Sequence, residues 1–284
     1  SSATLPPKLI EALFDAYRSG RLLYQKSVGL PNQILNICCA WFDEFNVAYS
    51  MHQNKDEFMK SHLRFVDKRI TELNQQIQLR KTKIVPLEPD STKPSVIIKL
   101  MADTIFNNVI DLHKIHNQHN PKLNKTISVG LIRIANVDKI VKISKQLLTN
   151  HIPPDFRIRS YIEAQLDAVL KRKSPENIWL VGSIQNTLNK YPNEHNHIFI
   201  TVASPVAEVG RDHDYDWAIA EPSSIRSLIQ LAGRVQRHRQ KEPHSPNFVI
   251  LSKNYKALSE KKVAYSKPGF ETESLTLTSH DLRD

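Results

Sequence analysis

The chain has few cysteines, few glycines and no long hydrophobic run, and each shortage excludes a class of protein. Its two cysteines, Cys38 and Cys39, are adjacent, so a disulfide framework or a cysteine-rich metal site is excluded and a reducing, cytoplasmic setting fits best. No apolar run approaches the roughly 18 residues that a membrane-spanning helix needs. The opening "SSATLPP" has neither the basic nor the apolar part of a signal peptide. We therefore expect no membrane partner.

Two further absences concern the start of the chain and its phosphate chemistry. The first residue is Ser1 and the first methionine is Met51, so we expect a piece of a longer protein. None of the seven glycines is followed by lysine, which excludes a G-x-x-x-x-G-K-[ST] phosphate-binding loop. The chain also lacks a D-E-x-H or D-E-A-D box. We therefore expect it not to hydrolyse a nucleoside triphosphate by itself.

Positive charge is what the chain has in excess. Lysine and arginine number 39 against 29 aspartate and glutamate, a formal net charge of +10. Such a balance favours a polyanionic partner such as nucleic acid, although a basic protein that merely stays soluble has the same composition. A hydrophobic content of 40% over 284 residues supports one large domain or two small ones.

The first 125 residues have a mainly helical pattern. Apolar residues at helical spacing predict helices over residues 7–20, 56–81 and 96–116. The apolar run "NQILNICCAWFDEF" is compatible with either a buried strand or a short helix.

From about residue 126 the pattern alternates between strands and helices. We expect strands at 126–135, 197–203, 216–221 and 247–251, with helices at 136–148, at 159–173 and from Ser224 onward. Apolar strands that alternate with helices predict an α/β fold, a parallel sheet with helices on both faces. The sequence therefore divides near residue 125, and the stretch 255–284, which has little periodicity, is expected to be a linker.

The segment "SLIQLAGRVQRHRQ", residues 227–240, is expected to form a single helix. At about 100° per residue, Gln230, Arg234 and Arg237 would lie within an arc of roughly 60°. The opposite side would bury four apolar residues against the sheet: Leu228, Leu231, Ala232 and Val235. Gly233 borders the polar arc and would let another group approach the backbone. Two guanidinium groups in such an array suit phosphate oxygens, whereas the plainer alternative is a basic surface helix with a chance glycine.

Two motifs in this part of the chain carry a family resemblance. Residues 201–217, "TVASPVAEVGRDHDYDW", form a strand end and a loop, where parallel sheets bind ligands. Together with Q-x-x-G-R-x-x-R they resemble motifs five and six of superfamily-two helicases, and "SSATLPP" resembles motif three. The whole stretch 200–239 is similar to the helicase–nuclease of type I CRISPR interference, particularly subtype I-F. "VGLIRIANVDKIVKI" and "PGFETESLTLTSHDL" are similar too, so the likeness covers most of the chain.

The resemblance implies an ATP-dependent DNA helicase–nuclease that an RNA-guided CRISPR surveillance complex recruits to single-stranded DNA. It would cut this foreign DNA, unwind it in the 3′-to-5′ sense and degrade it. Residues 1–125 would be the end of the first RecA-like lobe with a helical insertion, 126–254 the second RecA-like lobe, and 255–284 a linker toward an accessory C-terminal domain. The first lobe, in other domains of the same polypeptide, would hold most of the ATP and Mg²⁺, and the divalent metal of the nuclease would lie outside this chain.

Residue roles follow from the same resemblance. Arg234 and Arg237 would reach ATP, one of them as an arginine finger, and Gln230 would help hold the γ-phosphate. The other positions are assigned to the nucleotide cleft (Gly210, Asp212, Gly233), to the DNA backbone (Thr201, Ser204) and to the coupling of hydrolysis to strand movement (Ser2, Thr4).

Some patterns depart from the family or point elsewhere. The family has a longer strand and loop before the helix that is expected from Arg159. The pairs His213-Asp214 and His280-Asp281 suggest a metal phosphohydrolase, but the further ligands are missing, so no metal site is expected in this chain. Three histidines near residue 116 lack the i, i+4 spacing of a zinc helix and are expected at a solvated helix end: His113, His116 and His119.

Two alternatives stay open. The chain has the features of a second lobe of another superfamily-two motor, such as an RNA helicase. The missing phosphate loop also suits a non-catalytic fragment that binds nucleic acid or regulates a partner.

Overall fold

The computed structural model describes residues 6–30, 33–121, 123–162, 188–208, 213–239, 241–267 and 269–284. They fall into two compact units, Ser1–Ile77 and Gln78–Asp284. Four of the predicted site residues lie outside the described residues: Ser2, Thr4, Gly210 and Asp212. None of the helices in the described ranges is long and apolar enough to cross a bilayer.

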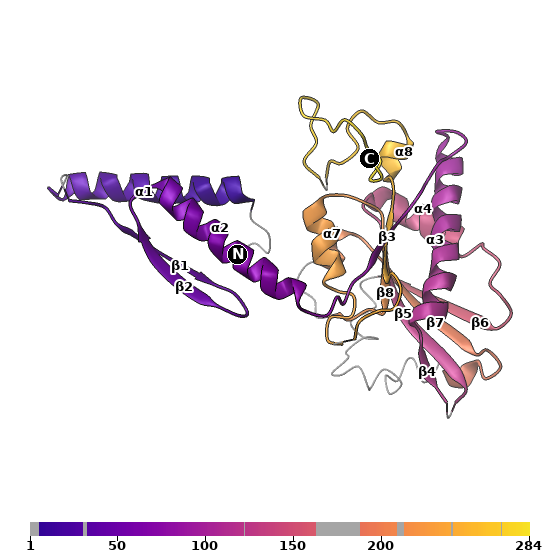
Figure 1. Ribbon diagram of the computed structural model, residues 1–284. Helices are drawn as coiled ribbons and strands as arrows, with labels where there is room; N and C mark the ends of the chain where they lie inside the picture. The colour runs from indigo at the N-terminus through magenta and orange to yellow at the C-terminus, as the bar shows by residue number, and fades with distance from the viewer. Residues whose placement is uncertain are drawn as a thin grey trace. The chain divides into compact units, whose positions relative to one another are not determined.

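The first unit consists of two helices and an antiparallel hairpin (Figure 1), in the order α1 (Pro7–Ser27), β1 (Ile37–Phe42), β2 (Val47–His52) and α2 (Lys55–Asn74). Asn54 caps α2, because its side-chain oxygen accepts the N–H of Glu57 at 3.0 Å. The ambiguous apolar run is thus a strand. A small core holds the unit together, in which the rings of Phe14 and Phe58 stack with centroids 4.4 Å apart.

The second unit is built on a seven-stranded sheet. Its order is β3 (Thr82–Val85), β9 (Phe248–Leu251), β8 (Trp217–Ala220), β5 (Lys125–Arg133), β7 (Asn196–Ala203) and β6 (Phe156–Ile162), all parallel, with β4 (Gln118–Asn120) antiparallel to β5. The helical elements are α3 (Pro94–His116), α4 (Val137–Leu147), η2 (Pro205–Glu208), α7 (Ile225–Ala232) and α8 (Tyr255–Leu258). The predicted α/β class is confirmed.

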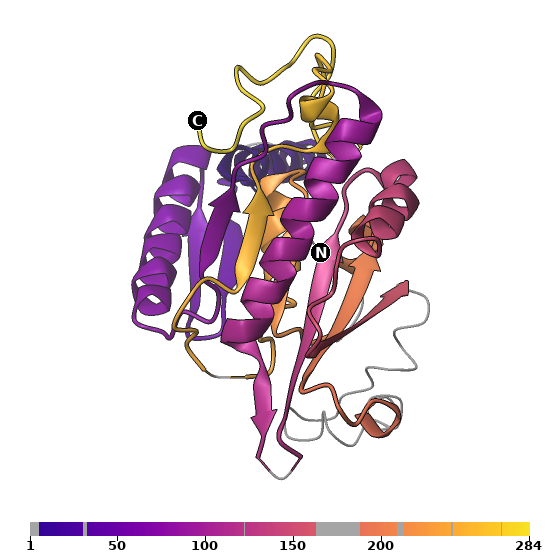
Figure 2. The same cartoon turned by 90° about the vertical axis from the view of Figure 1, so that its right-hand side faces the viewer.

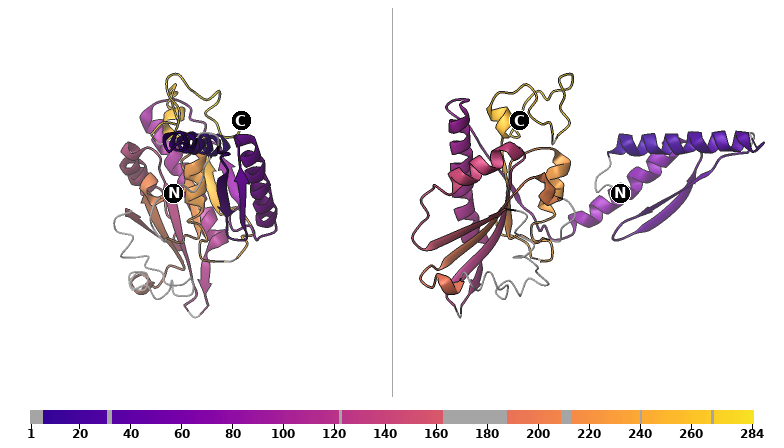
Figure 3. Two further views of the ribbon diagram at one scale, coloured as in Figure 1. Left: turned by 90° about the vertical axis from the view of Figure 1, so that its left-hand side faces the viewer. Right: turned by 180° about the vertical axis from the view of Figure 1, so that it is seen from behind.

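Helices cover both faces of this sheet, as the apolar strands predicted. On one face α3 and α4 pack over side chains such as Ile132 and Ile200, and Figure 2 shows α3 running across the strands. On the other face α7 contributes Leu228 and Leu231, and Figure 3 shows α7 on the side of the sheet away from α3. The side of α7 that was expected to be buried is the buried one.

The boundary between the units falls between Ile77 and Gln78, whereas the sequence placed a division near residue 125. Strand β3 pairs with β9, and α3 packs in the core of the sheet, so both belong to the second unit. A four-residue edge strand gives too weak a periodic signal for the sequence to place it in a sheet.

Residues 159–162 are strand and not the start of a helix. They belong to β6, which pairs with β7 from Phe156↔Asn196 to Ile162↔Val202. The helix expected over 159–173 is therefore wrong for its first four residues, and 163–173 lie outside the described residues. The short stretch 156–160 thus lies within strand β6.

Residues 255–284, which were expected to be a linker, belong to the second unit and are hydrogen-bonded to residues next to its sheet. Leu282 donates its N–H to the carbonyl of Ser252 at 2.9 Å. Glu271, only 8% exposed, accepts three backbone N–H groups and His280. Burial alone would raise the pKa of Glu271, but these hydrogen bonds outweigh burial and lower it to about 2.

Candidate functional site

Helix α7 ends earlier than its sequence suggested. The Ser224 side chain accepts the N–H of Ser227 and caps its start, and Gly233 is already its C-cap. The prediction of one helix carrying Gln230, Arg234 and Arg237 on one face is therefore wrong, because both arginines lie beyond the helix. Gly233 has an ordinary φ of −62°, so its role is to end the helix and not to supply unusual backbone freedom.

The residues that follow, 234–239, form what we call the arginine segment. A parallel bridge joins Val235 to Tyr215. The N–H of Tyr215 donates to the carbonyl of Arg234, and the carbonyl of Tyr215 accepts the N–H of Gln236, both at 2.9 Å. Because Tyr215 stands just before β8, this bridge fastens the segment to the chain that enters the sheet and stops the helix from continuing.

Arg239 fixes the far end of the arginine segment. Its guanidinium group bonds Asp214 through Nε at 3.1 Å and Nη2 at 2.8 Å, Asp216 through Nη1, and the carbonyl of Tyr215 at 2.7 Å. Burial would lower the pKa of Arg239, but the carboxylates of Asp216 and Asp214 outweigh burial and raise it. Arg239 therefore has a structural role and is charged at all relevant pH values.

Arg80 fixes the near end of the same segment. Its Nε donates to the carbonyls of Ala232 at 3.1 Å and Val235 at 2.9 Å, so it binds two acceptors left open where α7 ends. Burial lowers the pKa of Arg80, while the carboxylate of Asp214 opposes this and the positive charge of Arg237 adds to it. Arg237 thus lies within electrostatic range of a second guanidinium group.

The two predicted phosphate-facing arginines differ in their surroundings. Arg237 has an exposed side chain, and its backbone N–H donates to Asp214 at 3.0 Å. Arg234 is half-buried, and its Nη2 donates to the carbonyl of Glu208 at 2.9 Å. Gln230 is half-buried on α7. The bond to Asp214 therefore holds the backbone of Arg237 in place.

A buried polar cluster, which we call the Glu208 cluster, lies under η2 and α7. It consists of Glu208, Arg133, Ser223 and Ser227. Arg133 Nε lies 3.2 Å from Glu208 Oε1, and Ser227 donates its hydroxyl to the same oxygen. Burial lowers the pKa of Arg133 and raises that of Glu208, so each charge depends on the other.

The two residues predicted to touch DNA lie at the end of β7. Thr201 is 1% exposed, and its Oγ1 has no hydrogen-bond partner among the described residues. Ser204 is half-buried and accepts the N–H of Val206 at 3.3 Å, which starts η2. The side chain of Thr201 faces the core here, and the DNA role of both residues stays a prediction.

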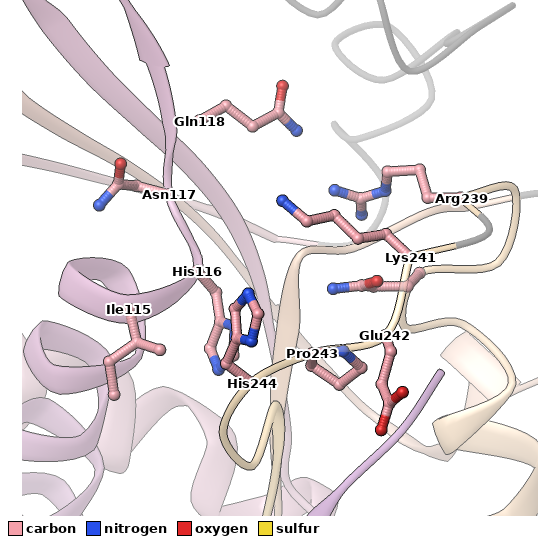
Figure 4. Close-up of a pocket in the computed structure, with 10 residues that line it drawn as sticks. Ile115, His116, Asn117, Gln118, Arg239, Lys241, Glu242, Pro243 and His244 are labelled. Atoms are coloured by element: carbon pink, nitrogen blue, oxygen red, sulfur yellow. The ribbon is translucent and has the colours of Figure 1, made fainter. Parts of the chain in front are cut away.

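A cavity of about 280 Å³, lined mostly by residues with polar or charged side chains, adjoins the arginine segment. Figure 4 shows Arg239, Lys241 and Gln118 pointing toward one another across it. Gln118 donates to the Asp216 carboxylate at 3.1 Å, the same oxygen that Arg239 binds. Two residues that line the cavity, Gln118 and Arg239, therefore also help to hold the arginine segment through Asp216.

The histidines have structural partners. His213 bonds the hydroxyl of Tyr215 at 3.1 Å, and His280 bonds Glu271 at 2.8 Å. His113 is fully buried, so the expectation of a solvated helix end is wrong for it; it bonds Ser128 at 2.8 Å, and burial lowers its pKa to about 4. No group of three or more potential metal ligands occurs among the described residues.

Sequence reasoning missed the residues that support the site. Arg80 had no motif to mark it, because its two acceptors are more than 150 residues away along the chain. Arg133 did leave a signal: an arginine inside the apolar strand "VGLIRIA" must find a buried partner. Glu208 lies within the quoted loop sequence, but only its burial beside Arg133 shows its role.

Comparison with known proteins supports the resemblance drawn from the motifs. Residues 126–240 match the family model described as "CRISPR-associated nuclease/helicase Cas3, C-terminal". The chain is 44% identical to the CRISPR-associated nuclease/helicase Cas3 subtype I-F/YPEST of Pectobacterium atrosepticum, an alignment that covers 99% of this chain and 27% of that protein. The corresponding protein of Pseudomonas aeruginosa is 39% identical over 100% of this chain and 28% of its own length.

Among solved structures, one titled "Crystal structure of CRISPR-associated protein" is similar with a TM-score of 0.40 and 14% sequence identity. The match covers 89% of this chain and 23% of that one. The chain thus spans little more than a quarter of the length of the two curated relatives, at 27% and 28%.

Proposed function

We propose that this chain, as a portion of a type I-F Cas3 helicase–nuclease, provides the second RecA-like lobe of an ATP-driven motor that unwinds and degrades DNA. In this proposal the unit Gln78–Asp284 is the second lobe, because β3 and α3 belong to its sheet and core. Residues before it lead from the end of the first lobe, where Ser2 and Thr4 couple hydrolysis to movement. The complete protein is a hydrolase, and this chain alone lacks a phosphate-binding loop.

The arginine segment is the observation that carries the proposal. Arg80, Tyr215 and Arg239 fix its backbone, and Arg237 is an exposed residue of this fixed segment. A cation held at a fixed position suits charge that develops during phosphoryl transfer, because the cost of orienting it has been met in folding. We assign Arg237 as the arginine finger, with Arg234 and Gln230 beside it on the nucleotide.

The donor set of this chain fits the phosphates of ATP better than it fits a metal ion. Guanidinium and amide groups donate hydrogen bonds to phosphate oxygens. The described residues offer no carboxylate and histidine cluster that would hold Mg²⁺. We therefore propose that the first lobe, elsewhere in the polypeptide, holds most of the ATP and its Mg²⁺, and that Gly210, Asp212 and Gly233 complete the nucleotide cleft.

The proposed polymer is single-stranded DNA, which an RNA-guided CRISPR surveillance complex exposes. The formal charge of +10 supports a polyanionic partner. Thr201 and Ser204 are assigned to its backbone at the end of β7, where loops of parallel sheets bind ligands. The nuclease metal belongs to the remaining domains of the same polypeptide, and a cytoplasmic location follows from the proposed role.

The proposal is tested by Arg237→Ala in the intact protein. We expect DNA-stimulated ATP hydrolysis to fall by about 10³- to 10⁵-fold while ATP binding is retained. Arg226→Ala is the matched control, because Arg226 is also an exposed arginine, in the first turn of α7. Normal turnover in Arg237→Ala, or an equal loss in Arg226→Ala, would reject the finger assignment.

A further inference from the structure

We propose that Glu208 is a positioning residue that holds Arg234 in place and links it to the segment assigned to DNA. This inference rests on the proposed function. It adds a role for a residue that has no contact with ATP or DNA in that proposal. Glu208 makes three connections at once, and each involves a different part of the second unit.

The first connection is to the segment assigned to DNA. Glu208 is the last residue of the single-turn element η2, and Ser204 starts that element by accepting the N–H of Val206. The carbonyl of Ser204 accepts the N–H of Ala207 at 3.1 Å, which closes the turn. A DNA backbone that binds Ser204 therefore acts on the same short turn that ends in Glu208.

The second connection fixes the carboxylate of Glu208 between the sheet and α7. Arg133, at the end of β5, lies 3.2 Å from Oε1, and Ser227, in the first turn of α7, donates its hydroxyl to the same oxygen. The side chains of Arg133 and Glu208 are 0% and 7% exposed, so water does not replace these partners easily. Arg133 also donates to the hydroxyl of Ser223 at 3.0 Å. Because Ser223 lies just before α7 and Ser227 lies in its first turn, the cluster holds the start of α7 on both sides of its N-cap.

The third connection is to the arginine. Arg234 Nη2 donates to the backbone carbonyl of Glu208 at 2.9 Å. Glu208, whose carboxylate is held by Arg133 and Ser227, thus also holds Arg234 through its backbone carbonyl. A displacement of η2 moves this anchor directly, whereas the parallel bridge between Val235 and Tyr215 holds the backbone of the arginine segment.

The consequence is a mechanical route from DNA to the nucleotide. When DNA engages the start of η2, the Glu208 cluster transmits the displacement to the guanidinium group of Arg234. Loss of the Glu208 charge should therefore reduce the turnover that DNA stimulates and should leave the affinity for ATP nearly unchanged.

The experiment is a double-mutant cycle in the intact protein, with Glu208→Gln, Arg234→Ala and the pair. Glu208→Gln should lower DNA-stimulated kcat by about 10- to 100-fold, because a misplaced catalytic group costs this much, with little change in the KM for ATP. The same change made in the Arg234→Ala background should have almost no further effect, since Glu208 acts through Arg234.

Two variants separate this role from a general loss of stability. Glu271→Gln is the matched control, because Glu271 is exposed to the same 8% as Glu208 but lies in the C-terminal segment; it should lose stability and keep its kcat. Ser227→Ala removes only one hydroxyl and leaves the ion pair, and it should lower kcat in the same direction by a smaller factor.

The outcomes are distinguishable. If Arg234→Ala itself turns over ATP normally, the proposed role of Arg234 fails and the inference fails with it. If Arg234→Ala is impaired but Glu208→Gln is not, or if the two losses multiply, the proposed function stands and the positioning role of Glu208 is overturned.

Discussion

Replacement of Arg239 by alanine tests how strongly the arginine segment is fixed to the sheet. The change leaves the carboxylates of Asp214 and Asp216 without their cation, although their side chains are only 2% and 1% exposed. Removal of one partner from a buried ion pair costs about 3–5 kcal/mol, a large part of a total stability of about 5–15 kcal/mol. At about 2–4 °C per kcal/mol for a domain of this size, Tm should fall by roughly 6–20 °C.

The assay is thermal unfolding followed by tryptophan fluorescence, to which Trp217 contributes, since it is fully buried in the second unit next to Asp216. Lys262→Ala is the control, because its ion pair with Glu273 spans 3.7 Å between side chains that are 70% and 84% exposed. This surface pair should contribute about 0–1 kcal/mol. An Arg239→Ala protein that is destabilised no more than the control would refute the structural role of Arg239.

Two further predictions concern the core and the C-terminal segment. Gly130→Ala should destabilise the second unit by about 1–3 kcal/mol or more in urea unfolding, because the added Cβ would stand 2.0 Å from the Trp217 ring. Gly20→Ala is the contrasting change: no atom lies within 4 Å of its added Cβ on helix α1, so it should stabilise the first unit by about 0.5–1 kcal/mol. The pKa of Glu271 is lowered to about 2 in the folded protein, so its contribution is complete above its unfolded pKa of about 4.3 and is lost as pH falls toward 2. The stability gap between wild type and Glu271→Gln should therefore close between about pH 5 and pH 2, and a gap that is independent of pH would contradict the assignment.

Elements with a strong local pattern were predictable from the sequence. Helix α3 shows Ile97, Met101 and Ile105 at helical spacing, and all three are fully buried in the structure. Strands β5 and β7 are continuous apolar runs, as expected of strands covered on both faces. Here local periodicity and tertiary packing favour the same structure.

The failures occur where a distant partner decides the local structure. The residues after Ala232 have a helical pattern, but the bridge to Tyr215 and the two bonds from Arg80 impose a course of turns and bends. The segment from Arg159 also looked helical, but pairing with β7 makes it a strand. The stretch around Glu271 has no periodicity, since its order comes from hydrogen bonds to one buried carboxylate.

The candidate site shows the same division. The motif singled out Arg234 and Arg237 but placed them on one face of a continuous helix, whereas the structure places both in the arginine segment beyond α7. The geometry of that segment was not predictable, because Arg80, Arg133 and Glu208 reach it from separate parts of the chain. A short motif marks candidate groups, whereas their orientation depends on contacts that are distant in sequence.

The most direct test of the account is the affinity of the intact Arg237→Ala protein for ADP with aluminium fluoride, a mimic of the transferring phosphoryl group. A residue that acts on the transition state should contribute strongly to the affinity for this mimic and hardly to the affinity for ATP. We predict that the variant loses most of its affinity for the mimic but binds ATP as the Arg226→Ala control does. Equal affinity of Arg237→Ala and the control for the mimic would contradict the central claim that this arginine acts on the transferring phosphate.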